Sequence, residues 1–158
     1  MKEETFQIRE AREQDCEQIL ACLQAAFAPY QSRYTPAAFA DTVLDAVTVK
    51  TRMERMHVLV AIAENHVIGT VSGAPCEGGE GHLRGMAVLG QYQSRGVAQD
   101  LLAAIEHWLK ENGCNRVTLD TTLPLDRAMK FYEKHGYKRS GRATDFFGMT
   151  LIEYAKNV

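Results

Sequence analysis

The sequence has 158 residues, of which 46% are hydrophobic and 24% charged, and its net charge is −2. This length and balance are typical of one globular domain with a sizeable core, so we expect a single domain over residues 1–158. The charge lacks the basic excess of nucleic-acid binders, and no apolar run approaches the roughly 18 residues that span a bilayer, which argues against nucleic acid and membrane as partners.

The four cysteines give no sign of a metal or redox centre. Cys16, Cys22, Cys76 and Cys114 are far apart and form no C-x-x-C pair. The chain also begins with the polar segment MKEET rather than with an apolar leader. We therefore expect reduced thiols, no bound metal and a cytoplasmic location.

The first third of the chain predicts a strand and two helices. Residues 6–9 alternate between apolar and polar side chains, as in a short strand. An apolar stripe follows over residues 15–27, and a second amphipathic helix is predicted over residues 36–47. The connecting residues 28–34 are predicted to form a loop that is too aromatic for a simple linker.

The remainder alternates strands with helices. Residues 57–63, 67–73 and 82–89 predict a meander of three strands, and a periodic helix follows over residues 95–112. The last third predicts a strand at 116–121, a helix at 124–135 and strands at 137–141 and 147–154. This order indicates a mixed α/β fold with helices on the faces of one sheet.

The junction between residues 89 and 98 is typical of an anion site. It contains Gln93, Ser94, Arg95, Gly96, Val97 and Ala98, a Q-x-x-G-x-A loop that joins a strand to a helix. Free backbone N–H groups and the helix dipole favour a phosphate or pyrophosphate at such a helix start. Gly96 lets the backbone approach the anion, and Ala98 keeps the first turn slim.

With the segment AMKFYEKHGY (128–137), this loop resembles the Gcn5-related N-acetyltransferase (GNAT) family. The resemblance covers nearly the whole chain. It implies a GNAT-like fold, with a central, mostly antiparallel, twisted sheet of about seven strands flanked by about four helices. It also implies acetyl-CoA as co-substrate. Two departures are Gly90 where the family often has proline and Leu125 where it often has asparagine.

The resemblance assigns coenzyme contacts to the fourth strand, the loop and the second motif. These residues are Met86, Ala87, Val88, Gln93, Ser94, Arg95, Gly96, Val97, Ala98, Ala128, Phe131 and Tyr132. The loop would bind the pyrophosphate, and the strand edge would pair with the pantetheine amides.

The expected chemistry is direct attack of a neutral amine on the thioester through a tetrahedral intermediate. Tyr132 is predicted as the general acid, because a phenol of pKa about 10 can protonate a leaving thiolate. The Val88 N–H is predicted to stabilise the oxyanion. The base is left open between His82, Asp120, Glu80 and water.

Acceptor contacts are expected from the variable parts of the chain. The expected contacts are Tyr30, Arg33, Tyr34, Asp145, Phe146 and Phe147. The aromatic ones could receive a small-molecule or peptide amine, or equally cover the core or form a homodimer seam. We therefore expect an N-acetyltransferase acting on a primary amine that the sequence does not identify. The alternative is a non-catalytic acyl-CoA-binding sensor or protein-docking module of the same fold.

Overall fold

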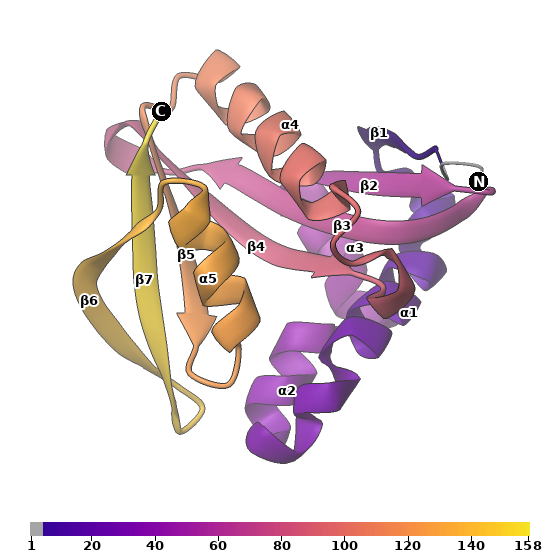
Figure 1. The fold of residues 1–158 in the computed structure, drawn as a ribbon, viewed down its shortest axis with the longest axis horizontal. Helices are drawn as coiled ribbons and strands as arrows, with labels where there is room; N and C mark the ends of the chain where they lie inside the picture. Colours follow the sequence, from indigo (N-terminus) through magenta and orange to yellow (C-terminus); the bar gives the residue numbers. More distant parts are fainter. Residues whose placement is uncertain (1–4) are drawn as a thin grey trace.

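The computed structural model describes residues 5–158, which form one seven-stranded sheet in the order β1-β2-β3-β4-β5-β7-β6 (Figure 1). Neighbouring strands are antiparallel except for the parallel pair β4 and β5. The predicted mixed, mostly antiparallel sheet is thereby confirmed. The strands are β1 Gln7–Glu10, β2 His57–Ala63, β3 His66–Pro75, β4 Glu80–Val88, β5 Arg116–Thr122, β6 Lys138–Phe146 and β7 Met149–Asn157.

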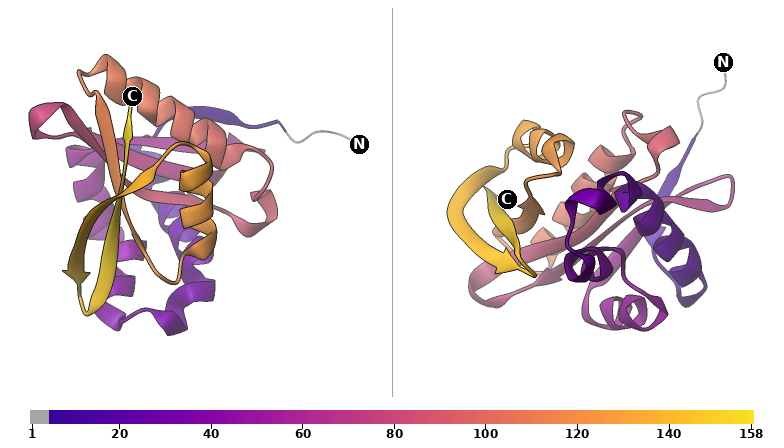
Figure 2. Two further views of the ribbon diagram at one scale, coloured as in Figure 1. Left: turned by 60° about the vertical axis from the view of Figure 1, so that its left-hand side comes forward. Right: turned by 90° about the horizontal axis from the view of Figure 1, so that it is seen from below.

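Helices cover both faces of the sheet. They are α1 Cys16–Phe27, α2 Pro36–Val43, α3 Ala46–Arg55, α4 Val97–Glu111 and α5 Asp126–Lys134. Two separate core clusters place α1 and α3 on one face and α4 and α5 on the other (Figures 1 and 2). Within residues 5–158, no helix is both long and apolar enough to cross a bilayer.

The helix predicted over residues 36–47 is in fact two helices, so the described chain has five α-helices rather than about four. The first ends at Leu44, whose φ of 63° is left-handed. Asp45 then caps α3 by accepting hydrogen bonds from the N–H groups of Val47 and Thr48. This cap stabilises a new helix start within the apolar period that predicted a continuous helix. The predicted loop 28–34 likewise contains the 3-10 helix Ala28–Arg33.

Helix α4 packs closely on the sheet because β3 presents glycine beneath it. A Cβ atom on Gly73 would lie 2.8 Å from Cγ1 of Ile105, so a larger residue would push the helix away. Ile105 itself is fully buried. Gly69 likewise lies beneath Val97 in the first turn of α4 and pairs with Val88, so these contacts fix the start of α4 relative to the end of β4.

The two central strands separate part-way along their length. Parallel pairing runs from Glu80 opposite Arg116 to Leu83 opposite Leu119 and then stops. On its other side, β4 contains a bulge where Gly85 has a φ of 65°. Beyond the bulge, the edge of β4 that faces β5 carries no partner strand among the described residues. This opening positions the site.

Candidate active site

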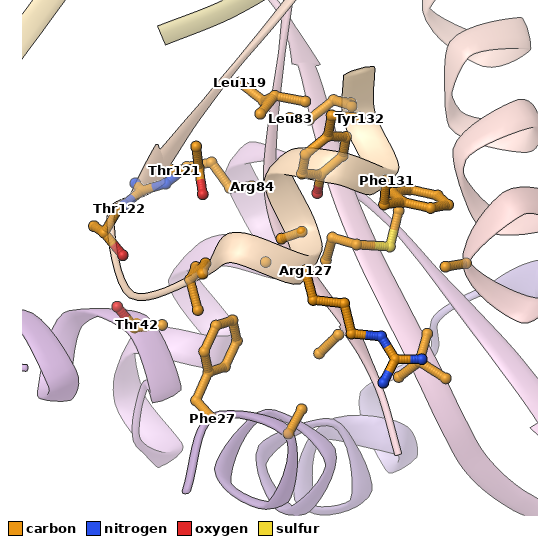
Figure 3. Close-up of a pocket in the computed structure, with 18 of the residues that line it drawn as sticks. Phe27, Thr42, Leu83, Arg84, Leu119, Thr121, Thr122, Arg127, Phe131 and Tyr132 are labelled. Carbon is orange, nitrogen blue, oxygen red and sulfur yellow. The ribbon is translucent and has the colours of Figure 1, made fainter. Parts of the chain in front are cut away.

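A cavity of about 840 Å³ occupies the gap between β4 and β5 (Figure 3). Its size is in the range of roughly 300–1,000 Å³ that is typical of small-molecule sites. Phe27 of α1 lines it on one face of the sheet, and Ala98 of α4 and Phe131 of α5 line it on the other. The cavity therefore passes through the sheet.

The loop before α4 has the geometry of an anion site. Ser94 and Gly96 have φ values of 63° and 85°, and α4 begins at the next residue without a side-chain cap. The N–H groups of Gly96, Val97 and Ala98 have no backbone acceptor in the described part of the chain. Such a nest of N–H groups at a helix start favours a bound phosphate.

Two hydrogen bonds hold this loop against its neighbours. The Gln93 side chain donates from Nε2 to the Val88 carbonyl at 3.3 Å. The Arg127 guanidinium donates to Ser94 Oγ at 2.8 Å, which ties the loop to the start of α5. The residues of the two sequence motifs therefore line one cavity.

The backbone of Val88 points into the gap. Leu89 donates its N–H to the Ile68 carbonyl at 2.9 Å, so the N–H of Leu89 faces β3. N–H groups alternate in direction along a strand, so the N–H and carbonyl of Val88 face away from β3. The hydrogen bond from Gln93 to that carbonyl agrees with this direction.

Most residues predicted to contact the coenzyme line the cavity. They are Met86, Ala87, Val88, Gln93, Ser94, Gly96, Ala98, Ala128, Phe131 and Tyr132. Arg95 and Val97 do not line it. The guanidinium of Arg95 lies 5.8 Å from the ring centroid of Tyr92, and Val97 is buried in the core.

Tyr132 of α5 is buried with its hydroxyl directed into the cavity (Figure 3). Edge-to-face contacts with Phe131 and Tyr137, at centroid distances of 5.4 and 5.7 Å, fix its ring. Among the described residues its hydroxyl has no hydrogen-bond partner. Burial raises the pKa of Tyr132 above its ordinary value, so the phenol stays protonated at neutral pH and acts as a donor.

His82 and Asp120 lie together on β4 and β5. His82 Nε2 is 3.5 Å from Asp120 Oδ2, and its Nδ1 forms a 2.8 Å hydrogen bond with Thr118 Oγ1. Burial lowers the His82 pKa, an effect that Asp120 partly offsets, and burial raises the Asp120 pKa. Glu80 instead forms an ion pair with Arg116 and does not line the cavity.

The aromatic residues that were predicted to contact the acceptor amine lie in different environments. Tyr30 and Tyr34 line the cavity, but the Tyr34 hydroxyl is already hydrogen-bonded to Thr122 Oγ1 at 2.7 Å. Phe147 does not line the cavity, because it lies in the β6–β7 turn with its side chain 53% exposed. Its neighbour Phe146 lines the cavity instead.

Several polar residues of the cavity were not identified from the sequence. Arg52, Asp41 and Arg84 line its α1 and α3 side, and Arg84 donates to Asp41 Oδ2 at 3.2 Å. Thr121 of β5 also lines the cavity, and its buried hydroxyl has no partner among the described residues. In the sequence, only the strand alternation of Thr121 hinted at its position.

The lining suits an acyl-coenzyme A. The loop N–H groups match a pyrophosphate, the free edge of β4 matches the amides of a pantetheine arm, and Ala98 and Ala128 leave space between them. The Tyr132 hydroxyl is a donor in the cavity wall that has no partner among the described residues. Leu125 adds apolar surface where the family often has asparagine.

Known acetyltransferases share this fold. PaiA N-acetyltransferase of Thermoplasma acidophilum, solved with coenzyme A, superposes with a TM-score of 0.80 at 18% identity over 98% of this chain and 99% of that one. The ribosomal-protein-S18-alanine N-acetyltransferase of Escherichia coli superposes with a TM-score of 0.78 at 16% identity over 98% and 94%. At these identities the likeness shows the fold.

Similarity in sequence to one relative covers a shorter part of the chain than the similarity in fold. An aminoglycoside N(6′)-acetyltransferase type 1 of Salmonella typhimurium is 32% identical over 60 residues, which are 38% of this chain and 41% of that relative. The chain thus spans less than half of that relative's length. The signature of the acetyltransferase (GNAT) family, however, matches residues 16–137, which include both motifs. The chain therefore belongs to the acetyltransferase (GNAT) family.

Proposed function

We propose that the protein is an acetyl-CoA-dependent N-acetyltransferase that acylates a primary amine of a small molecule or peptide. The observation that carries this proposal is the protonated Tyr132 hydroxyl in a cavity between two separated strands, one of which directs the Val88 N–H into the same gap. Membership of the GNAT family and its coenzyme A-bound structural neighbour support it.

Different parts of the chain bind different parts of the donor, acetyl-CoA. The N–H groups of Gly96, Val97 and Ala98 hold the pyrophosphate, and the exposed edge of β4 at Met86 and Val88 pairs with the pantetheine arm. Phe131 supplies apolar surface beside the arm. When bound, the coenzyme supplies the acetyl thioester.

Tyr132 and Val88 act on opposite ends of the reacting bond. Val88 donates its N–H to the thioester oxygen as negative charge develops there. Tyr132 donates its proton toward the leaving sulfur, whose conjugate acid has a pKa of about 8.5. The raised pKa of Tyr132 keeps that proton in place until the sulfur takes on charge.

His82 and Asp120 together are the proposed base. An ammonium of pKa about 10.4 must lose a proton before it attacks, and burial keeps His82 neutral at pH 7 so that it can accept one. Asp120 lies 3.5 Å from Nε2 and stabilises the imidazolium that forms. Glu80 is not proposed, because Arg116 binds it outside the cavity.

Substitution of Tyr132 tests the proposal. Tyr132→Phe removes the proton donor, so we expect kcat to fall by about 100-fold or more, with the affinity for acetyl-CoA changed less than twofold. Release of free thiol from acetyl-CoA with a panel of primary amines measures this. A non-catalytic acyl-CoA-binding module would bind the coenzyme and release no thiol with any amine.

Tyr137→Phe is the matched control. The Tyr137 hydroxyl is also buried, but it has no partner among the described residues and does not line the cavity. Turnover of Tyr137→Phe should therefore stay close to wild type. Equal turnover of Tyr132→Phe and wild type at several pH values would remove Tyr132 from the reaction.

The cellular location and the oligomeric state of the protein stay proposals. The four cysteines are free thiols, which supports a reducing compartment such as the cytoplasm. The homodimer suggested by the aromatic segments stays a prediction.

A further inference from the structure

An arginine from α3 reaches the cavity beneath the bulge in β4. The side chain of Arg52 lies near Val49 and Met53, and its guanidinium rests against Gly85. A Cβ atom on Gly85 would lie 2.6 Å from Nη1 of Arg52. The left-handed φ of Gly85 favours glycine at the bulge, and the absence of a Cβ there leaves room for the guanidinium.

The charge of Arg52 is not balanced by the protein. Among the described residues, no carboxylate lies within 4 Å of its guanidinium, and no hydrogen bond is made to it. The carboxylate of Asp41 is near enough to affect the Arg52 pKa but is hydrogen-bonded to Arg84. A half-buried cation without a partner is costly, so this site favours an anion from outside the chain.

Burial makes the unbalanced charge of Arg52 less favourable. It lowers the pKa of Arg52 to about 10, and the positive charge of Arg84 acts in the same direction. The group nevertheless stays charged at neutral pH. A bound carboxylate would make a charge-assisted, two-point contact with it.

The position of Arg52 does not suit the coenzyme phosphates. Arg52 extends from α3 on the α1 face of the sheet, whereas the N–H nest lies at the start of α4 on the opposite face (Figures 1 and 2). The cavity connects the two faces through the gap between β4 and β5. With the coenzyme phosphates at the N–H nest, Arg52 lies on the side of the cavity that is left for the acceptor.

The charges on this side suit a molecule with two opposite charges. The His82–Asp120 pair receives the amine, and Arg52 supplies a separate positive site in the same cavity. Asp41 and Arg84 form an ion pair with each other, so they add no net charge. Arg52 therefore stays a positive site separate from the His82–Asp120 pair. We propose that the acceptor is a primary amine that also carries a carboxylate, and that Arg52 binds this carboxylate.

This inference rests on the proposed function and narrows its substrate class. An aminoglycoside, which the name of the Salmonella relative specifies, carries several ammonium groups and no carboxylate. The cavity would place such a cation beside Arg52, whose charge the protein does not balance. Repulsion between like charges disfavours it relative to an amino acid.

Matched pairs of amines test the inference. Each α- or ω-amino acid of a panel is compared with its own carboxamide, which has the same shape without the charge. Because a hydrogen bond to a charged group contributes enough for a preference of about 10- to 100-fold, wild-type kcat/KM should favour the acid by that factor. In Arg52→Met the acid-to-amide ratio should fall to about 1, mainly through KM, and Arg52→Lys should restore part of it.

Arg55→Met is the matched control. Arg55 lies one turn further along α3, is exposed and loses the same charge on substitution. It should keep the wild-type acid-to-amide ratio. A ratio near 1 in wild type, or an unchanged ratio in Arg52→Met, would overturn the inference while leaving the acetyltransferase proposal intact.

Calorimetry separates the two proposals. Amino acids and their carboxamides are titrated into the protein loaded with coenzyme A, which carries no acetyl group and so permits binding without turnover. Tighter binding of the acids to wild type and Arg55→Met than to Arg52→Met supports the role of Arg52 even if no amine releases thiol. Equal binding of acid and carboxamide to wild type counts against it.

Discussion

Burial decides the protonation of the ionisable side chains at the centre of the cavity. It raises the pKa of Tyr132 and lowers that of His82, so both are neutral at pH 7. One is then a proton donor and the other a proton acceptor. The two roles follow from two types of side chain in one low-dielectric environment.

The pH dependence of the reaction should identify the base. His82 accepts a proton only when it is neutral, and its folded pKa is below its usual 6.5. The acid limb of kcat/KM should therefore lie below pH 6.5. Because the Asp120 charge raises the His82 pKa, Asp120→Asn should move this limb to still lower pH.

The same variants distinguish the rival bases. If Asp120 accepts the proton itself, Asp120→Asn loses most of its activity at every pH instead of shifting the profile. His82→Ala with a wild-type profile would exclude the histidine. Glu80→Gln serves as the control and should keep the wild-type profile, since Arg116 binds Glu80 outside the cavity.

Residues in local motifs were predictable, and residues placed by distant contacts were not. Gly96 and Tyr132 each stand in a short pattern that predicted their place at the site, and both line the cavity. Arg52 lies in a segment without such a pattern, and its position depends on a bulge at Gly85 that belongs to another element. Phe146 and Phe147 were both predicted at the site, but the tight β6–β7 turn places only Phe146 in the cavity lining.

At the scale of elements, the loop between β4 and α4 depends on one left-handed residue. Gly96 has a φ of 85°, and no atom would contact a Cβ there, so the conformation rather than space requires glycine. A β-branched residue in this region costs about 1–2 kcal/mol and turns the N–H groups away from the anion. Gly96→Val should therefore weaken coenzyme A binding by at least about tenfold.

Gly90→Val is the control for this loop. Gly90 has no left-handed φ, and a Cβ there would also meet open space. Calorimetric titration with coenzyme A should give a dissociation constant near wild type for Gly90→Val. Wild-type affinity in Gly96→Val would show that the loop does not hold the pyrophosphate.

The break between α2 and α3 shows why element boundaries were harder to predict than element types. Apolar periodicity continues through Leu44 and Val47, which favoured one helix. Asp45 and Thr48 nevertheless form a capping box. This local signal starts a new helix although the apolar periodicity continues. Strand β6 is likewise longer than predicted because its polar segment pairs with β7, and β7 extends to Asn157 because its last residues pair with β5.

At the scale of the molecule, the sheet consists of two parts joined by a short parallel ladder. Pairing between β4 and β5 ends at Leu83 and Leu119, and no described strand continues it. The fold class was predictable because it follows from the order of elements. The width of the gap was not, because it depends on how the two parts twist apart.

Amide hydrogen exchange should report ligand binding across this gap. Saturating acetyl-CoA, in the absence of an amine, should slow exchange at Val88 by at least about tenfold, because its N–H gains the thioester oxygen as an acceptor. The adjacent amide of Leu89 is the internal control, since it is already bonded to Ile68 and should change little. Equal rates at Val88 with and without acetyl-CoA would contradict the proposed contact between its N–H and the thioester oxygen.

Because the cavity passes through the sheet, it affects the order in which the substrates bind and the products leave. In the reaction proposed above, the donor enters the gap from the side of α4 and α5, where the N–H nest lies, and the acceptor enters from the side of α1 and α3. Each route stays open while the other is filled, so both substrates can be held at once. The acetyl group then passes directly between them, and the two products leave by separate exits.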